Sequence, residues 1–312
     1  MYYNDAIKQD YLATMRAKSQ ITGLFAAFKA KEEELQQDVG AMSDEQALAL
    51  YQSLNTTNLT TIKIKLPYLN SYRRWYREHF NDWDRNSSDS ISYKQIDLSR
   101  SMRNTFVCSW SDIMDELRAV DYDFYQGYEA APILAFSWLG INVLGATTLL
   151  KEQIDCKNGL IFDSHHTLQV RDMEAEIKDI FSIYQNTAEA TRTRNQVERV
   201  YANASPYFIH RMDSENNTKS VNEPRAPATM LHQIRMLAAD YETRTGKPSK
   251  MVPQNVLYSG CYHRLHQYMQ TNPNTKNREV QFEMRRRIGY NNMPVSEMMY
   301  LYEQYKKAFN LY

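Results

Sequence analysis

Few groups of side chains in this sequence have the residue types and the spacing that chemistry requires. The densest is His263-Arg264-Leu265-His266, in which two histidines on one stretch could hold a metal ion. No acidic or cysteine partner lies close to it, so we interpret it as an exposed helix surface. His165-His166 is interpreted as part of a loop. The sequence therefore predicts no metal site.

No other motif points to a common enzyme class. The chain lacks the Gly-x-x-x-x-Gly-Lys loop of nucleotide hydrolases, the Gly-x-Gly-x-x-Gly turn of dinucleotide sites and the Gly-x-Ser-x-Gly elbow of hydrolases. Its three cysteines, Cys108, Cys156 and Cys261, are widely spaced and odd in number, which is typical of reduced thiols. We expect no cofactor.

Length and composition indicate a two-domain cytoplasmic protein. The chain has 312 residues, of which 43% are hydrophobic and 24% charged, so it is long enough for two domains with their own cores. No apolar run is long enough to span a bilayer, and the first residues do not resemble a signal peptide. We therefore expect no membrane partner.

The net charge of zero hides an alternation along the chain. Residues 61–104 carry nine basic and five acidic side chains, and residues 192–287 carry sixteen and eight. Residues 1–50 and 105–191 are acidic instead. Two basic segments can form one positive face on a neutral molecule, and contacts with phosphate groups require such a face. The alternative is that exposed helix surfaces distribute these charges evenly.

Hydrophobic spacing predicts that the first hundred residues are helical. Apolar side chains recur at helical intervals at Ile21, Leu24, Phe25 and Phe28. The acidic run 32–34 is most simply a solvated helix surface. Ser43 and Gln46 have the form of a capping box that opens a short helix over 47–54. Another helix is expected from residue 60 or 61 through Tyr76, with Pro67 as its start or a kink, followed by a polar loop over 81–90.

The rest of the chain is predicted to mix helices with a few short strands. Ser109 or Ser111 is the expected N-cap that opens it. The expected helices cover 112–120, 123–138, 143–152, a segment from 172 onward, and 228–243. Short strands over 159–162 and 167–170 would form a small hairpin, and 207–209 would add another short strand.

The segment 138–149, Trp-Leu-Gly-Ile-Asn-Val-Leu-Gly-Ala-Thr-Thr-Leu, carries the most informative pattern. It resembles an active-site box of the tyrosine recombinases (phage integrases), which reads roughly Gly-Leu-Arg-x-x-Glu-x-x-x-Leu. Asn142 stands where that family has the arginine that clamps the scissile phosphate. A neutral amide can donate a hydrogen bond, but it lacks the charge and the bidentate fork that stabilise a phosphorane.

The resemblance implies the other boxes in the family's order. The second box, His-x-Leu-Arg-His, is matched at Asn255-Val256-Leu257-Tyr258, where Asn255 replaces the histidine and Tyr258 the second arginine. In the third box Tyr290 replaces a histidine. The nucleophile would be Tyr300, with Tyr302 and Tyr305 close behind, although tyrosines at this spacing are more simply core packing. Without both arginines, the resemblance implies a scaffold that binds DNA and does not cleave it.

Three further segments narrow the resemblance. They are the opening 2–8 (Tyr-Tyr-Asn-Asp-Ala-Ile-Lys), the stretch 259–265 (Ser-Gly-Cys-Tyr-His-Arg-Leu) and the ending 302–309 (Tyr-Glu-Gln-Tyr-Lys-Lys-Ala-Phe). Together they resemble the MrpR (YopR)-type master repressors of SPβ-like prophages, which have an integrase fold without recombinase activity. The implied fold is mainly α (α+β): an N-terminal helical core-binding (SAM-like) domain over 1–106, and an integrase-catalytic-like helical domain with a small β-sheet over 107–312.

The resemblance also implies a function. The protein would be a sequence-specific transcriptional repressor that maintains lysogeny by occupying operator sites in double-stranded DNA, in the cytoplasm and associated with the nucleoid of the bacterial host. Self-association and phage-encoded or peptide regulators are partners that it leaves open. The family grips DNA between its two domains. The expected contacts are Lys63, Lys65, Arg73, Arg74, Arg77, Arg192, Arg194, Arg225, Lys247, Lys250, His263 and Arg264.

Two alternatives stay open at this point. A divergent but active recombinase would use Tyr300 or Tyr302 as nucleophile, with cations such as Arg264 supplied from other turns. A helical interaction module without DNA affinity would agree with the zero net charge and with the many tyrosines.

Overall fold

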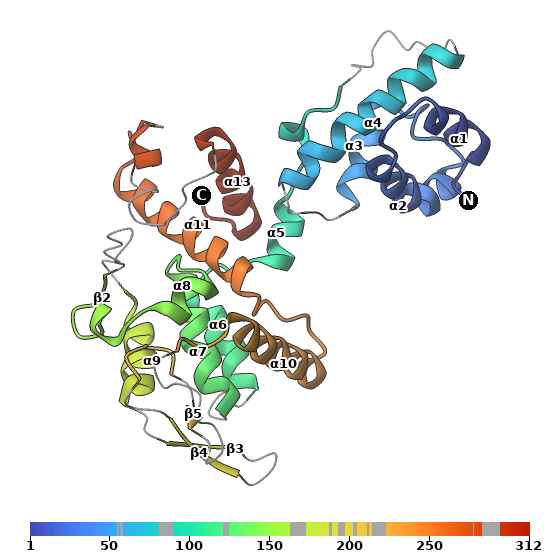
Figure 1. Cartoon of the computed structure of the whole chain (residues 1–312). Helices are drawn as coiled ribbons and strands as arrows, with labels where there is room; N and C mark the ends of the chain where they lie inside the picture. Colours follow the sequence, from blue (N-terminus) through green and yellow to red (C-terminus); the bar gives the residue numbers. More distant parts are fainter. Residues whose placement is uncertain are drawn as a thin grey trace. The chain divides into compact units, whose positions relative to one another are not determined.

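The chain is mostly helical and divides into two compact units (Figure 1). Unit 1 comprises Met1–Arg103 and Lys306–Tyr312, and unit 2 comprises Asn104–Tyr305. The computed structural model describes residues 1–54, 56, 59–80, 90–120, 125–162, 173–186, 189–192, 197–201, 205–210, 212–213, 223–276, 278–282 and 294–312. None of the described helices combines the length and the hydropathy that crossing a membrane requires.

Unit 1 begins with four helices whose caps and apolar faces follow the sequence. Its elements are α1 (Asp5–Ala13), α2 (Ser19–Leu35), α3 (Asp44–Gln52), α4 (Leu59–Phe80), the 3-10 turn η1 (Tyr93–Gln95) and most of α5 (Ser99–Thr105). The Ser43 hydroxyl accepts the Gln46 N–H, and the Gln46 side chain accepts the Ser43 N–H. The predicted capping box is confirmed. Helix α3 begins at Asp44, directly after the N-cap, and therefore three residues earlier than expected.

Aromatic side chains join α1, α2 and α4 in the core of unit 1. The predicted apolar face of α2 is confirmed, since Phe25 and Phe28 are fully buried. The Phe25 ring lies 4.7 Å from the ring of Tyr72 on α4. Pro67 lies within α4, which continues past it to Phe80.

One acidic side chain of α2 departs from the prediction. Glu32 is completely buried, and its carboxylate lies 2.5 Å from the Lys8 ammonium of α1. It also accepts the Val39 N–H at 2.8 Å. The prediction that Glu32 belongs to a solvated surface was wrong, because a cation from another helix compensates its charge inside the core.

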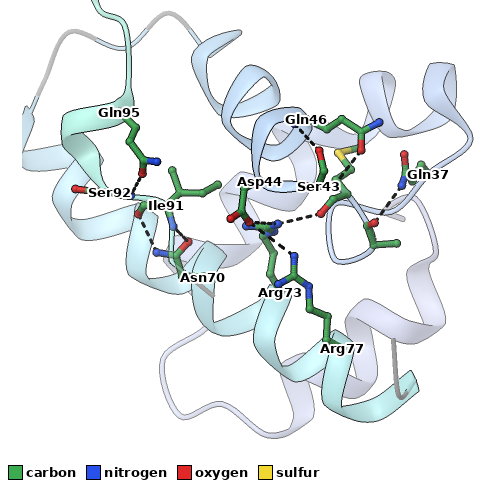
Figure 2. A network of polar contacts seen from close by, with 12 residues as sticks. Gln37, Ser43, Asp44, Gln46, Asn70, Arg73, Arg77, Ile91, Ser92 and Gln95 are labelled. Carbon is green, nitrogen blue, oxygen red and sulfur yellow. Dashed lines mark hydrogen bonds and ion pairs between the residues drawn. The ribbon is translucent and has the colours of Figure 1, made fainter. Parts of the chain in front are cut away.

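The chain returns to α4 through paired hydrogen bonds. The Asn70 amide donates to the Ile91 carbonyl at 3.0 Å and accepts the Ile91 N–H at 3.1 Å (Figure 2). Most of the predicted loop over 81–90 lies outside the described residues.

The C-terminal residues also belong to unit 1, where Arg103 Nε donates to the Ala308 carbonyl at 2.7 Å and Lys307 pairs with Asp97. The sequence had placed Lys306–Tyr312 with the C-terminal domain.

Unit 2 is organised around one buried helix, α7. The helices of this unit are α6 (Trp110–Ala119), α7 (Tyr125–Trp138), α8 (Val143–Thr148), α9 (Ala175–Asn186), α10 (Pro227–Thr245), α11 (Pro253–Thr271) and the greater part of α13 (Val295–Phe309). Helices α8, α9, α10 and α11 pack against α7, whose residues 133–136 are completely buried. The predicted N-cap Ser109 opens α6, and its N–H donates to the Asp112 carboxylate at 2.9 Å.

Gly260 lets α11 approach α7 closely. A Cβ at this position would lie 1.9 Å from the backbone oxygen of Trp138. No side-chain rotation could relieve such an overlap, because the atom that it meets belongs to the backbone. Glycine is therefore required where these two helices cross.

The small sheets of unit 2 differ from the expected hairpin. Strand β1 (Ile154–Asp155) pairs antiparallel with β2 (Leu160–Ile161), with Ile154 opposite Ile161. The second predicted strand, 167–170, lies outside the described residues. A further sheet, which the sequence did not predict, has the order β3 (Glu189–Arg192), β4 (Val197–Tyr201), β5 (Met212–Asp213).

Helix α8 also ends earlier than predicted. It stops at Thr148, and Leu149 is extended and accepts the Phe208 N–H at 2.8 Å. The predicted strand at 207–209 is present as a single antiparallel bridge between Leu150 and Tyr207. This long-range pairing replaces the last turn that the local pattern had predicted, and the 3-10 turn η2 (Lys151–Gln153) follows it.

Candidate DNA interface and degenerate active site

Asn142 is used to begin a helix. Its Oδ1 accepts the Gly145 N–H at 2.8 Å, so the side chain is the N-cap of α8. The preceding turn depends on Gly140, which has a positive φ of 92°. Asn142 itself is exposed. An amide in this position satisfies a helix terminus and brings no positive charge.

Neither Asn255 nor Tyr258 brings a cation to the first turns of α11. The helix opens with Pro253 in its first turn, and the Asn255 carbonyl accepts the Ser259 hydroxyl at 2.8 Å. Tyr258 is half-buried, and its ring centroid lies 6.4 Å from that of Phe106. The close approach of Gly260 to Trp138 places this turn of α11 next to the segment that carries Asn142. Trp138, the first residue of the first matched box, therefore packs against the helix that carries the second box.

The C-terminal tyrosines of unit 2 differ in burial and in the hydrogen bonds of their hydroxyl groups. The Tyr302 hydroxyl lies 2.9 Å from His266 Nδ1, and burial raises its pKa to about 12. The Tyr305 hydroxyl is completely buried and donates to the Val107 carbonyl at 2.9 Å, and burial also raises its pKa. Tyr300 is half-buried on the same helix. Tyr290 lies outside the described residues.

Arg73 and Arg77 are part of the interior of unit 1. Arg73 Nη2 donates to the Met42 carbonyl at 2.9 Å and to Asp44 Oδ1 at 2.8 Å, and Arg77 Nη2 lies 3.8 Å from the same carboxylate oxygen (Figure 2). Their side chains are only 1% and 4% exposed. The prediction that they contact DNA is corrected here, because a guanidinium buried against Asp44 does not reach a phosphate at the surface.

The other expected cations of unit 1 lie on α4. Lys63 and Arg74 are exposed, and Lys65 is half-buried. Lys63 and Arg74 are about three helical turns apart. They therefore share one face of the helix, with about 16 Å between them along its axis. The Lys63 ammonium also lies 5.4 Å from the centre of the Tyr93 ring. These side chains remain candidates for phosphate contacts.

In unit 2 two of the expected cations lie in the loop between α10 and α11. Helix α10 ends at Gly246, which has a positive φ of 68°, and α11 begins at Pro253. Lys247 is exposed and Lys250 is half-buried. The Lys250 N–H donates to both carboxylate oxygens of Glu116, at 3.1 and 3.0 Å. The loop that carries the lysines is thus fastened to α6.

Arg225 and Arg264 do not fit a direct phosphate contact. Arg225 is 16% exposed, and its Nη2 lies 3.1 Å from the completely buried Glu129. All three guanidinium nitrogens of Arg264 are buried. Both predictions are corrected, because the Arg225 guanidinium is mostly buried against Glu129 and the Arg264 guanidinium is buried.

His263 also faces inward. It is half-buried, its Nδ1 lies 3.0 Å from the Cys108 carbonyl oxygen, and its ring lies 5.2 Å from that of Trp138. Burial lowers its pKa, which disfavours the charged imidazolium. The predicted DNA contact at His263 stays a prediction. Arg194, the side chain of Arg192 and the pair His165-His166 lie outside the described part of the structure.

Glu116 is the residue of this region that the sequence analysis missed. It is 6% exposed, and it lies on the apolar face of α6 with Ile113 and Leu117. A carboxylate in the apolar stripe of an amphipathic helix is the signal that could have identified it. Such a group needs partners that only the folded chain provides.

The comparison with known protein families gives one match. Residues 2–78 match the model of the "MrpR, N-terminal core-binding domain" family. This match covers about a quarter of the chain and spans α1 to almost the end of α4. No curated protein matches the chain. Residues 2–78 are therefore similar to the core-binding domain of MrpR-type proteins.

Proposed function

We propose that this protein is a sequence-specific DNA-binding repressor on a recombinase scaffold that has lost strand cleavage. The observation that carries the proposal is the chemistry at the positions of the two clamp arginines. Asn142 caps α8, and Tyr258 packs beside Phe106. Removing one oxyanion-type donor typically costs about 10²–10³ in rate. A site without both arginines has no comparable means of stabilising a pentavalent phosphate.

DNA binding is supported by the family match and by the cations that remain exposed. The core-binding family covers the part of the chain that carries Lys63 and Arg74. Lys247 and Lys250 supply positive charge from the loop before α11. We propose further that the protein binds operators in double-stranded DNA of the host nucleoid and that this repression maintains lysogeny. Regulation by self-association or by a phage-encoded protein or peptide belongs to it as well.

Duplex binding at graded salt tests the DNA interface. We expect a labelled mixed-sequence duplex to be bound at low salt, with an affinity that falls steeply as the salt concentration rises. The Lys63→Ala and Arg74→Ala variants should each lower the slope by about 0.9, the value for one phosphate contact. Lys31→Ala is the matched control, because Lys31 is an exposed cation of unit 1 that pairs with Glu34 on α2. Absence of binding even at low salt would overturn the proposal.

Sequence preference and cleavage need separate assays. Repeated selection from a random duplex library should enrich one motif, and a library that stays random would contradict sequence-specific repression. A nicked suicide duplex traps a recombinase as a covalent phosphotyrosyl adduct. We expect no adduct. An adduct that disappears in the Tyr300→Phe variant would replace the repressor proposal with that of an active recombinase.

A further inference from the structure

Glu116 holds the α10–α11 loop through several hydrogen bonds. Its carboxylate accepts the Ser249 hydroxyl at 2.8 Å and the Lys250 N–H at 3.1 and 3.0 Å. Ser249 Oγ in turn accepts the Met251 N–H at 3.1 Å. One buried carboxylate on α6 therefore fixes three consecutive residues, which lie more than 130 positions further along the chain.

The position of this carboxylate is costly and specific. Glu116 is buried, and burial raises its pKa, whereas the donors of the loop lower it. A buried carboxylate is tolerated only when donors surround it, and here the donors come from the loop. The carboxyl group of Glu116 and the observed loop conformation therefore stabilise each other through these hydrogen bonds.

The loop also carries two cations that are candidates for phosphate contacts, Lys247 and Lys250. Lys247 follows the end of α10, Lys250 donates directly to the carboxylate through its N–H, and Met251 is buried just before α11. We infer that Glu116 is a positioning residue for DNA binding: it fixes the backbone from which Lys247 and Lys250 extend. This inference rests on the proposed DNA-binding function. It assigns to an acidic side chain a favourable role in binding a polyanion.

The sign of the effect separates positioning from simple electrostatics. If Glu116 acted only through its charge, its removal would strengthen binding to DNA, because one repulsive charge disappears. Loss of the clamp instead leaves a loop that must be ordered when DNA binds, and ordering a few side chains costs affinity. We therefore expect Glu116→Gln to weaken duplex binding about tenfold, which corresponds to about 1.4 kcal/mol.

Two variants and a control make the test specific. Ser249→Ala removes the hydroxyl that links Glu116 to Met251 without changing any charge, and it should weaken binding in the same direction. Asp115→Asn is the matched control, because Asp115 is the neighbouring carboxylate, is 71% exposed and pairs with Arg118. It removes the same charge without touching the loop, so it should leave affinity unchanged or slightly higher.

The salt dependence distinguishes this inference from the proposed function. In Glu116→Gln and Ser249→Ala both lysines remain, so the slope of affinity against salt should stay that of the parent protein. The double variant Lys247→Ala/Lys250→Ala should lower the slope by about 1.8, because two phosphate contacts are lost. Hydrogen exchange of the Lys250 amide in the free protein should become faster in both clamp variants.

Each outcome decides a different point. If the lysine variant binds like the parent, the loop does not contact DNA, and the inference fails while DNA binding through α4 still stands. If the lysine variant is weakened but Glu116→Gln and Ser249→Ala are not, the loop binds DNA without the clamp and the inference is overturned. Tighter binding by Glu116→Gln would overturn it too. Absence of duplex binding by the parent protein overturns the proposed function itself, and the inference with it.

Discussion

Replacing Gly260 with alanine tests the packing that joins the two matched boxes. In the structure a Cβ on Gly260 would lie 1.9 Å from the Trp138 backbone oxygen and 2.8 Å from its carbonyl carbon. Carbon and carbonyl oxygen approach to about 3.3 Å in proteins, so α11 and α7 would have to separate locally by about 1.4 Å. The expected result is a loss of stability in unit 2.

The size of the loss follows from what lies around this contact. Trp138, Val256 and Cys261 are completely buried. If the helices separate, these side chains lose van der Waals contacts, and the gap is too small for water to enter and replace them. Overpacking typically costs about 1–3 kcal/mol, and a clash with backbone lies at the upper end, at about 3 kcal/mol. For a unit of this size, that corresponds to a decrease of about 6–12 °C in Tm.

Thermal and urea unfolding, followed separately in each unit by hydrogen exchange, measures the effect. Gly23→Ala is the matched control, because Gly23 lies on α2 and a methyl group added there would meet no atom within 4 Å. That variant should be more stable by about 0.5–1 kcal/mol, since alanine has the higher helix propensity. A Tm of Gly260→Ala within about 2 °C of the parent would refute the reasoning.

Three shorter predictions concern single side chains. Burial lowers the pKa of His210 to about 4, so between pH 6.5 and 4 the unfolded chain binds a proton that the folded chain does not. The free energy of unfolding should therefore fall by about 3 kcal/mol as the pH drops through that range. Urea unfolding should show that His210→Gln loses this pH dependence, whereas His232→Gln, at an exposed position, keeps it. Asp44→Asn leaves the buried Arg73 without its charged acceptor and should cost about 3 kcal/mol in unit 1, and an unchanged urea midpoint would contradict the burial of this pair. Asn142→Ala removes the cap of α8 and should cost about 1 kcal/mol, whereas Asn142→Asp should retain most of the stability; equal losses in thermal unfolding would argue against capping.

Features that depend on neighbouring residues could be predicted from the sequence. The Ser43–Gln46 capping box and the Ser109 N-cap were both confirmed, because each hydrogen bond closes within one helical turn. The apolar face of α2 followed from helical spacing for the same reason. The resemblance to MrpR-type proteins could also be seen in the sequence, and residues 2–78 do match the core-binding model of that family.

Features that depend on distant partners could not be predicted. The sequence offered Arg73 and Arg225 as DNA contacts because both are cations in basic segments. Arg73 instead pairs with Asp44, which is 29 positions away, and Arg225 with Glu129, which is 96 positions away. Which helices pack together decides whether a guanidinium faces solvent or a buried carboxylate. The residue type alone does not indicate this packing.

The sequence by itself determined the match of residues 2–78 to the core-binding family and the mainly helical fold, because these depend on residue identity and on local spacing. The tertiary structure decided which cations remain at the surface, how Gly260 brings α11 against α7, and that Glu116 fastens the loop of Lys250 across 134 positions. The physical reason is the same in each case. A buried charge or a close backbone contact is stabilised only by groups that folding brings together from distant parts of the chain.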